Sequence, residues 1–587
     1  MHAALESLAS QVMQEALELS EPPQVLLRAT TDPKHGDYQI NGAMALAKRL
    51  KKNPREIAEV IANAIGAHEA IESAEVAGPG FVNLRLSPAW VGAQLSEALK
   101  SAHLGITQVD VADTIVVDFS SPNIAKQMHV GHLRSTIIGW SLVKLLRVVG
   151  HKVIGDNHLG DWGTQFGLLI VGTREWGDPE AMKKDAIGEL ERVYKLASKK
   201  AKEDDAFAQS ARDELAKLQG GDPENRERWK GFVNATRATL DQVYARLGVE
   251  FDEWLGESAY DEMLEGVVAM LLEKGIARED QGAVGVFLAD VDASAIEGAL
   301  PNAIPKKLKK QKTPFIVRKS DGAFLYSTTD IATVIHRKEK MGADRSIYVV
   351  GAPQALHFQQ LFATARLMGI EMELEHVSFG QVLGDDGKIL RTRDGSAVTL
   401  KSLLDEAEVQ ARKTVAEKRE GGTLRVADAD VEDAVKVIGI GAVKFADLKQ
   451  NRNTDYKFDF AKMVAFSGDA GPYLQYQYAR TRSIFREGGF DFETHAAQIQ
   501  PEKPEERALA IELARFDDRV QLAVEKLEPH HVCQHLYAIA SLFSKFYSEC
   551  KVLGSAEQES RLSFTALTGK QLRLGLDLLG IEVIERM

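Results

Sequence analysis

SSPNIAKQMHVGHLRSTIIGWSLVKLL, residues 120–146, is the stretch that decides the fold. An apolar run, TIVVDF (114–119), precedes it, and from Leu133 onward apolar residues recur at the spacing of one helix face. A second strand-like run, HKVIGD (151–156), follows the helical pattern. Strand, helix and strand in this order predict a βαβ unit, the building block of a parallel sheet that is covered by helices.

Two histidines, His129 and His132, stand at the predicted start of this helix with Gly131 between them. A helix N-terminus offers free N–H groups and about half a positive charge, so it binds anions. Gly131 removes a side chain where another group must approach the backbone closely. Because residues three apart project to the same side, both imidazoles can donate hydrogen bonds to phosphate oxygens, and Lys126 adds a mobile cation.

Two other interpretations of the histidine pair stay open at this point. Two histidines three apart can bind a metal, but no Glu or Cys lies at a supporting spacing. The pair can also be an ordinary helix start.

The length and composition of the chain limit its class. A chain of 587 residues exceeds what one core usually holds, which predicts two to four domains. A formal charge of −13 argues against indiscriminate nucleic-acid binding but leaves room for a local basic surface. The two cysteines, Cys533 and Cys550, exclude a disulfide framework and a four-cysteine zinc site. No secretory signal or membrane span is predicted, so we expect a cytoplasmic protein.

The pattern along the chain predicts three domains. Residues 1–110 are typical of a small α+β unit, and residues 111–420 of a parallel α/β sheet domain. A charged helical insertion interrupts the sheet domain at about 172–280. From Gly421-Gly422 to the end, residues 421–587, every predicted element is helical.

The HVGH string after a strand resembles the HIGH signature of class I aminoacyl-tRNA synthetases. Small adenylyltransferases share HxGH, but SSPNIAKQMHVGHLRST followed by GDNHLGDWGTQFG is similar to arginyl-tRNA synthetases specifically. The resemblance extends over nearly the whole chain, through TDPKHGDYQINGAMALAK, YSTTDIA, GAPQALHFQQL, GDAGPYLQYQYAR and the terminal LGIEVIERM. It implies a Rossmann-type catalytic domain, an N-terminal domain that contacts tRNA and an all-α anticodon-binding domain.

A guanidinium presents five donors and no acceptor, so its pocket needs planar oxygen acceptors. Asp118 ends the first strand, at the edge where parallel sheets bind ligands. By resemblance, Asp118, Asn123, Tyr326, Asp330 and Gln354 form the arginine pocket. Aspartate and tyrosine would contact the guanidinium, while Asn123 and Gln354 would hold the α-amino and carboxylate groups. The alternative for Asp330 is an ordinary helix N-cap.

Class I synthetases carry a KMSKS-like loop over the triphosphate, and this chain has no such string. At the corresponding position stands GQVLGDDGKILRTRDGSAVTL (380–400), in which Lys388, Arg391 and Arg393 could fill the role. The resemblance implies that Lys126 compensates for the departure, and a plain hairpin is the alternative. We expect ATP as substrate with Mg²⁺ on its triphosphate, and no protein-bound zinc.

Two segments are candidates for contact with tRNA. GDAGPYLQYQYARTRSIFRE (468–487) interleaves aromatic and basic residues, among them Tyr473, Tyr476 and Arg480, which suits unstacked bases and phosphates. The alternative is a helix core edged with charge, and resemblance to the anticodon-binding domain favours RNA. GPGFVN (78–83) resembles the strand of the N-terminal domain that meets the tRNA D-loop, so Phe81 and Asn83 are candidates, although a Phe in a strand is usually core.

The resemblance as a whole implies an arginine–tRNA ligase. ATP and L-arginine would give arginyl-adenylate, and the 2′-hydroxyl of the terminal adenosine of tRNA(Arg) would take the arginyl group. We expect adenylate formation to need tRNA, and we expect a monomer. The rival hypotheses are another class I synthetase, a small adenylyltransferase, which has no use for the C-terminal helices, and a synthetase-like RNA-binding protein without activity.

Overall fold

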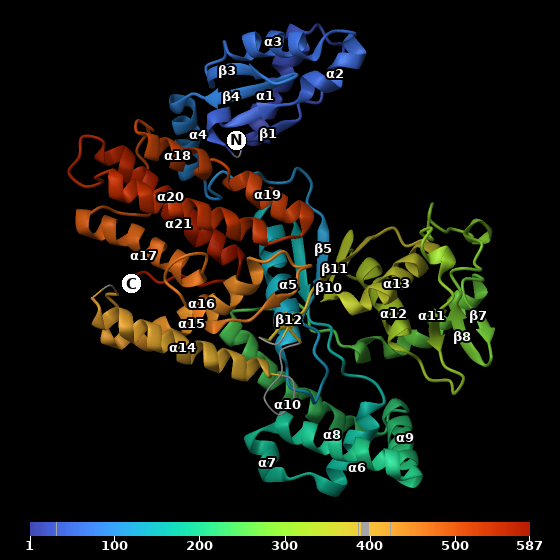
Figure 1. Ribbon diagram of the computed structural model, residues 1–587. Helices are drawn as coiled ribbons and strands as arrows, with labels where there is room; N and C mark the ends of the chain where they lie inside the picture. Colours follow the sequence, from blue (N-terminus) through green and yellow to red (C-terminus); the bar gives the residue numbers. More distant parts are fainter. Residues whose placement is uncertain (31, 385–386, 389–397, 423) are drawn as a thin grey trace.

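A four-stranded parallel sheet lies at the centre of the molecule (Figure 1). The computed structural model describes residues 1–30, 32–384, 387–388, 398–422 and 424–587. The strand order is β11-β10-β5-β6, and α5 (Val130–Val148) connects β5 to its parallel neighbour β6, so the predicted βαβ unit is confirmed. The strands are β5 (Thr114–Asp118), β6 (Lys152–Asp156), β10 (Arg345–Gly351) and β11 (Glu373–Phe379).

Helices cover both faces of this sheet, because its strands alternate between two cores. Ile115 and Val117 pack in one core with the buried residues of α5. Val116 and Tyr348 pack in the other with α12 (Tyr326–Glu339) and α13 (Ala355–Leu367). Burial on both faces explains the uninterrupted apolar run in β5.

The N-terminal domain is a small antiparallel sheet with helices, and it lies at one end of the molecule (Figure 1). Its strands follow the order β1-β2-β4-β3, and its last helix, α4, packs on α18 (Pro504–Leu513) of the C-terminal domain. The elements are α1 (His2–Ala16), β1 (Leu27–Ala29), β2 (Tyr38–Ile40), α2 (Gly42–Leu50), α3 (Pro54–Ile65), β3 (Ile71–Ala77), β4 (Phe81–Leu86) and α4 (Pro88–Lys100). The domain boundaries at 110 and 420 stay predictions.

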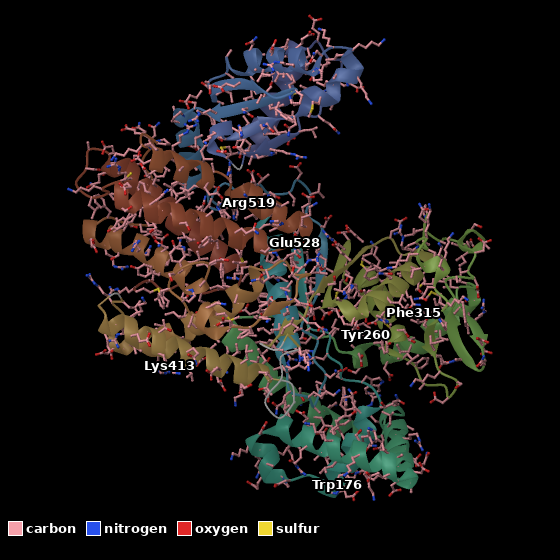
Figure 2. All side chains as sticks on the ribbon, viewed as in Figure 1. Trp176, Tyr260, Phe315, Lys413, Arg519 and Glu528 are labelled. Carbon is pink, nitrogen blue, oxygen red and sulfur yellow. The ribbon has the colours of Figure 1, made fainter. Side chains whose placement is uncertain are left out.

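The helical insertion follows β6 and forms a separate layer at the opposite end from the N-terminal domain (Figure 1). Four of its five helices begin after an aspartate that accepts backbone N–H bonds, which satisfies the free donors of each helix start. The helices are α6 (Gln165–Trp176), α7 (Pro179–Lys184), α8 (Ala186–Glu203), α9 (Asp205–Gln219) and α10 (Pro223–Leu247). Trp176, labelled in Figure 2, marks the far end of this layer.

A second, antiparallel sheet lies beside α12 and α13. Its strands are β7 (Arg278–Asp280), β8 (Ala283–Val286) and β9 (Phe315–Arg318), and α11 (Leu264–Glu273) packs against α12. Phe315 in Figure 2 belongs to this unit. The sequence indicated the strand at 315–318 but not the sheet, because β7 and β8 are too short for an alternating pattern.

Helices from residue 400 onward cover the outer side of α5. Four of them contact it: α14, which precedes the predicted boundary at 420, and α15, α19 and α21, which follow it. The last residues of the chain lie beside α15 and α17. The elements are α14 (Leu400–Glu420), α15 (Val431–Leu448), α16 (Phe460–Met463), α17 (Gly471–Gly488), α18, α19 (Phe516–Lys526), α20 (His530–Glu549) and α21 (Gln558–Leu578). Cys533 and Cys550 are buried free thiols. Among the described helices, none combines the length and apolar composition needed to cross a bilayer.

The prediction that only helices follow residue 421 is wrong at one place. A two-residue strand, β13 (Tyr456–Lys457), pairs in parallel with β12 (Val382–Leu383). Backbone bonds from Gly380 to Arg452 (2.8 Å) and from Phe458 to Leu383 (3.1 Å) extend the contact. Two residues give no periodic signal, so only tertiary pairing reveals the strand.

A buried ion pair joins the catalytic sheet domain to the C-terminal domain beside this strand. The guanidinium of Arg134, on α5, lies 3.1 Å from a carboxylate oxygen of Asp447, on α15, and both side chains are almost fully buried. Its Nη1 donates to the carbonyl of Thr454 (3.2 Å), and the hydroxyl of Tyr456 donates to Asp447 (2.9 Å). The four groups fix α5, α15 and β13 relative to one another.

We expect Arg134→Ala to lower the free energy of unfolding by about 3–5 kcal/mol, because it leaves Asp447 buried without its cation. The midpoint of urea denaturation, followed by circular dichroism, measures the change. Arg147→Ala is the matched control, since Arg147 lies on the same helix but pairs with Asp252 at the surface and should change stability by less than about 1 kcal/mol. Equal effects of the two variants would contradict this account.

Candidate active site

The two histidines of HVGH cap the start of α5 reciprocally. The backbone N–H of Gly131 donates to Nδ1 of His129 (3.1 Å), and the backbone N–H of His129 donates to Nδ1 of His132 (3.1 Å). The ring centroids are 4.0 Å apart. A backbone N–H is always a donor, so each Nδ1 is an acceptor and the proton of each neutral ring sits on Nε2.

Both rings are held neutral. Burial lowers the pKa of His129, and burial together with the His129 ring and Lys126 lowers the pKa of His132 to about 3. Each imidazole therefore presents one Nε2–H donor at the helix start, where the backbone N–H groups of residues 129–132 already have acceptors within the chain. A pair of fixed neutral donors can bind phosphate oxygens without a proton being exchanged as charge develops.

Gly131 is required by the first of these rings. A Cβ added at Gly131 would lie 2.9 Å from Cε1 and 3.0 Å from Nδ1 of His129. The close approach that the sequence predicted at this glycine is therefore made within the protein, by the capping imidazole.

The turn that precedes the histidines carries Asn123 and Lys126, both exposed. Asn123 forms a backbone bridge with Gly160, which follows β6, and a Cβ on Gly160 would meet its side-chain oxygen at 2.2 Å. Asn123 thus lies at the carboxyl edge of the sheet, between the turns that follow β5 and β6.

Asp118 is placed differently from the prediction. Its Oδ2 accepts from Nη2 of Arg337 on α12 (2.7 Å), and its Oδ1 accepts from the hydroxyl of Ser121 (2.9 Å). The same guanidinium nitrogen lies 2.7 Å from Asp156 at the end of β6. Asp118 is 5% exposed, and its carboxylate is already paired with an arginine of the chain. Local sequence could not reveal this contact.

Tyr326 and Asp330 come together as predicted, on the first turns of α12. Their shared neighbour is His357 of α13: its Nε2 lies 2.6 Å from Oδ2 of Asp330, and its ring is 5.0 Å from that of Tyr326. Asp330 lies inside α12, whose N-cap is Leu325, so the N-cap alternative is excluded. Gln354 is exposed at the turn before α13, one helical turn from His357.

A second carboxyl, Glu257, lies near enough to Asp330 for the two to interact electrostatically, although no sequence pattern marks it. It begins the 3-10 helix Glu257–Met263, and its backbone N–H donates to the carbonyl of Leu159 (3.0 Å). Burial raises the pKa of Glu257 to about 7; the Asp330 and Asp161 carboxyls add to the shift and His158 opposes it. A buried acid that gives up a proton near neutral pH beside Asp330 suits a cationic ligand.

Two groups of described residues have the spacing of metal ligands, and neither contains His129 or His132. Asp118, Asp156 and His158 form the first, but Arg337 already neutralises its carboxylates. Glu528, His530 and His531 form the second, which lies in the C-terminal domain (Glu528 is labelled in Figure 2). The metal interpretation of the histidine pair gains no support.

The predicted second ATP element is described only in part. Arg391 and Arg393 lie outside the described residues, and Lys388 lies within them. The chain leaves this element beside the histidines: the N–H of Val130 donates to the carbonyl of Val398 (3.3 Å), and the N–H of Leu400 donates to that of Met128 (2.8 Å). The residues that precede this element, in β12, therefore pair with β13, and the residues that follow it bond to the backbone next to HVGH.

The candidate tRNA residues of α17 form one face. Tyr473, Tyr476 and Arg480 are half-exposed, whereas Tyr478 is buried. The Arg480 guanidinium lies 5.0 Å from the Tyr476 ring and 5.4 Å from that of Tyr547 on α20, and the ring centroids of Tyr473 and Tyr537 are 6.1 Å apart. Phe543 and Phe546 of α20 are core residues, whereas Tyr547 is 41% exposed.

In the N-terminal domain, Phe81 and Asn83 share the outer face of β4. They are half-buried and alternate with the buried Val82, Leu84 and Leu86. The amide of Gln39, on β2, donates to the side-chain oxygen of Asn83 (2.8 Å). Phe81 is therefore not a core residue.

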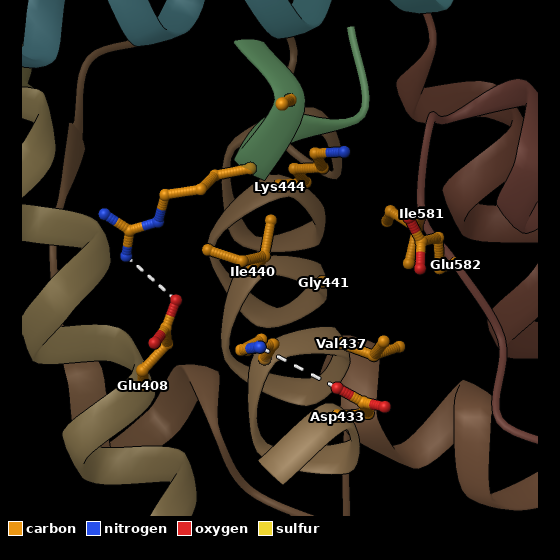
Figure 3. A pocket seen from close by; sticks show the side chains of 11 residues that line it. Glu408, Asp433, Val437, Ile440, Gly441, Lys444, Ile581 and Glu582 are labelled. Carbon is orange, nitrogen blue, oxygen red and sulfur yellow. Dashed lines mark hydrogen bonds and ion pairs between the residues drawn. The ribbon is translucent and has the colours of Figure 1, made fainter. Parts of the chain in front are cut away.

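A separate pocket lies where the insertion meets α14 and α15 (Figure 3). It measures about 360 Å³ and is lined by the end of α10, by α14 and α15, and by Ile581 and Glu582. None of the predicted site residues lines it. Its walls join the insertion to the C-terminal domain: Arg246 donates to Glu408 (2.8 Å), and Lys444 donates to the carbonyls of Leu247 and Gly580.

Comparison with known proteins covers every part of the chain. Three family models match: "Arginyl tRNA synthetase N terminal domain" at residues 3–86, "tRNA synthetases class I (R), catalytic domain" at 94–460 and "DALR anticodon binding domain" at 474–587. The arginine–tRNA ligase of Pseudoalteromonas atlantica is 43% identical over 96% of both chains. That of Klebsiella pneumoniae (strain 342) is 42% identical over 99% of this chain and 100% of its own.

Solved structures agree over the full length. Arginyl-tRNA synthetase from Plasmodium falciparum gives a TM-score of 0.81 at 26% identity, covering 100% of this chain and 99% of that one. The Thermus thermophilus enzyme gives 0.80 at 26% identity, covering 99% and 100%. Fold, HVGH cap and domain order define a class I aminoacyl-tRNA synthetase. Within that class, the chain belongs to the arginyl-tRNA synthetase family.

The depressed pKa of His132 predicts acid sensitivity. Its folded pKa lies below the unfolded value of about 6.5, so the neutral ring stabilises the fold above that pH and the contribution is lost as pH falls towards 3. His132→Asn keeps an acceptor for the N–H of His129 but cannot titrate. We expect wild type to lose about 2 kcal/mol more than His132→Asn between pH 7.5 and pH 5, measured by urea denaturation. Parallel losses would show that His132 does not titrate abnormally.

Proposed function

We propose that this chain ligates L-arginine to tRNA(Arg) with ATP, releasing AMP and pyrophosphate. Membership of an aminoacyl-tRNA ligase family supports the reaction class. One observation supports the chemistry most directly: two neutral Nε2–H donors stand at a helix start at the carboxyl edge of a parallel sheet. That edge is where such sheets bind ligands.

In the first step, the arginine carboxylate attacks the α-phosphorus in line, the bond to the bridging oxygen breaks, and pyrophosphate leaves. No protein nucleophile is needed, so positioning and charge neutralisation carry the rate. His129 and His132 would donate to the phosphates through their Nε2–H groups, and Gly131 leaves room for the capping ring of His129. Lys126 and the element with Lys388, Arg391 and Arg393 would supply mobile positive charge. ATP would enter as its Mg²⁺ complex, with the ion held by the phosphates.

The guanidinium would bind between carboxylates at the start of α12. Asp330 and Glu257 are the acceptors we favour, with Tyr326 beside them, because among the described residues neither carboxyl forms an ion pair with a lysine or an arginine; Asp330 contacts the ring of His357. Asp118 would act through Arg337, and it would add negative field rather than a free acceptor. Asn123 and Gln354 would hold the α-amino and carboxylate groups. A planar acceptor set would reject lysine, whose ammonium cannot fill it.

In the second step, the 2′-hydroxyl of the terminal adenosine of tRNA(Arg) attacks the arginyl carbonyl and AMP leaves. Tyr473, Tyr476 and Arg480 would stack on and pair with anticodon-loop nucleotides, and Phe81 and Asn83 would contact the D-loop. We propose a cytoplasmic monomer that forms the adenylate only with tRNA bound.

Aminoacylation of tRNA(Arg) with each of the twenty amino acids tests the proposal and separates it from its rivals. We expect arginine alone to be esterified. Esterification of a different amino acid would indicate another class I specificity, and tRNA binding without any esterification would indicate an inactive RNA-binding protein.

Glu257 makes arginine binding pH-dependent. Its carboxyl is protonated below about pH 7 in the free protein, and only the ionised form attracts a guanidinium. We therefore expect the KM for arginine to rise by up to about tenfold from pH 8 to pH 6, with the KM for ATP nearly constant. Glu257→Gln should raise the KM at pH 8 and remove this pH dependence. Glu250→Gln, an exposed carboxyl on the same connection, is the control; retention of the wild-type profile by Glu257→Gln would disprove the role.

The need for tRNA in the first step can be measured separately. We expect arginine-dependent exchange of pyrophosphate into ATP to be slow without tRNA(Arg) and fast with it. Charged or periodate-inactivated tRNA supplies the control for transfer to the 2′-hydroxyl. Full exchange in the absence of any tRNA would contradict the prediction.

A further inference from the structure

The turn between β5 and the histidines holds an unfavourable backbone conformation. Three residues without the freedom of glycine have positive φ there: Ser120 (71°), Ser121 (48°) and Ala125 (61°). A left-handed conformation costs such residues roughly 1–2 kcal/mol each. It persists only where the surrounding structure imposes it, and such strain clusters at functional sites. The groups that hold this backbone conformation therefore help to shape the turn before His129 and His132, where ATP is proposed to bind.

Two of the groups that hold this turn belong to α10 of the helical insertion. Outside the insertion, the N–H of Ser120 donates to the hydroxyl of Ser135 (2.9 Å) and that of Ser121 to the side-chain oxygen of Asn157 (3.1 Å). The N–H of Ala125 donates to the hydroxyl of Thr236 (3.2 Å), which in turn donates to the carbonyl of Phe232 (2.9 Å). Two turns further along α10, the hydroxyl of Tyr244 lies 2.7 Å from that of Ser120. Thr236 is fully buried and Tyr244 is 2% exposed. Both ends of the strained turn are thus bonded to one face of α10.

Helix α8 of the insertion, which neighbours α10, contacts the side chain of Lys126. The Nζ of Lys126 lies over the ring of Tyr194, on α8, at 5.7 Å from its centroid. This is within the range of a cation–π interaction. Lys126 is also close enough to His132 to lower the pKa of that imidazole. Lys126 is therefore held between an aromatic face and the phosphate-binding helix start.

The far end of α10 is anchored outside the insertion. At the pocket of Figure 3, Arg246 donates to Asp405 and Glu408 of α14, both at 2.8 Å. Lys444 of α15 donates to the carbonyl of Leu247, the last residue of α10. Because α8 packs on α10, the C-terminal domain fixes the helix that holds the turn.

We infer that the helical insertion is a positioning element for adenylate formation. Thr236 and Tyr244 help to hold the 120–125 turn, and Tyr194 holds Lys126 beside His132, so that the cation is in place before ATP arrives. This inference rests on the proposed function and assigns the insertion a role in its first step. Tyr194 contacts no substrate; it is a positioning residue that acts through Lys126.

A double-mutant cycle on Tyr194 and Lys126 tests the inference. The readout is arginine-dependent pyrophosphate exchange at saturating tRNA(Arg), which gives kcat and the KM values of ATP and arginine. We expect Tyr194→Leu to lower kcat/KM for ATP roughly 3- to 10-fold, the range of one cation–π contact, and to leave the KM for arginine unchanged. Tyr194→Phe, which keeps the ring, should retain activity. In a Lys126→Met background, Tyr194→Leu should have no further effect.

Controls separate positioning from folding. Trp176→Leu makes the same kind of change in the insertion, at a ring that contacts Phe207 (5.6 Å) rather than the turn, and should leave exchange unchanged. Thr236→Ser keeps the hydroxyl and should act as wild type. Thr236→Val removes it at nearly equal volume and should lower kcat/KM for ATP. All variants should keep wild-type affinity for tRNA, measured by filter binding.

Two results would overturn the inference: wild-type kcat/KM in Tyr194→Leu, or an equal fold-loss from Tyr194→Leu with and without Lys126. Either result in a protein that still forms arginyl-adenylate leaves the proposed function intact. Failure of the wild-type chain to activate arginine would instead remove the proposed function itself, so the two failures are distinguishable.

Discussion

The structure depends on a pair of backbone-to-imidazole hydrogen bonds at the start of α5. They use Nδ1 of His129 and of His132 as caps, and so leave both Nε2–H groups free. The same bonds require a glycine at 131, because the His129 ring folds against its Cα. One local constraint thus explains the residue types of HVGH, the neutral state of its rings and the direction of its donors. The proposed phosphate binding would follow from helix capping rather than from an added catalytic group.

The insertion and the C-terminal helices both contact this helix or the turn before it. The C-terminal helices cover α5 and bury the pair that Arg134, two residues beyond His132, forms with Asp447. Thr236 and Tyr244 of the insertion form hydrogen bonds with the turn before the histidines. The loop expected over the triphosphate runs from the β12–β13 pair back to Met128 and Val130. An RNA seated on the C-terminal domain would therefore act on groups that are bonded to the ATP site.

Sequence reasoning succeeded where the signal is local and periodic. The run in β5, the helix that follows it, and the histidine spacing define the sheet and the anion site, and YSTTD does begin a helix at Tyr326. It missed contacts made across long separations. Arg337 reaches Asp118 over 219 positions, and Asp330 influences the pKa of Glu257 only because the chain returns from the insertion. The sequence position of a carboxylate or a cation does not show which residue it pairs with. The two-residue strand β13 is too short to give a periodic pattern.

The central claim is that His132 is a neutral imidazole with its proton on Nε2. Nitrogen-15 NMR of the chain labelled at histidine measures it directly, with His132→Asn to assign the signals. The account predicts, at neutral pH, a protonated Nε2 and an unprotonated, hydrogen-bonded Nδ1, with titration well below the ordinary range of histidine. A proton on Nδ1, or a doubly protonated ring near pH 6.5, would contradict it.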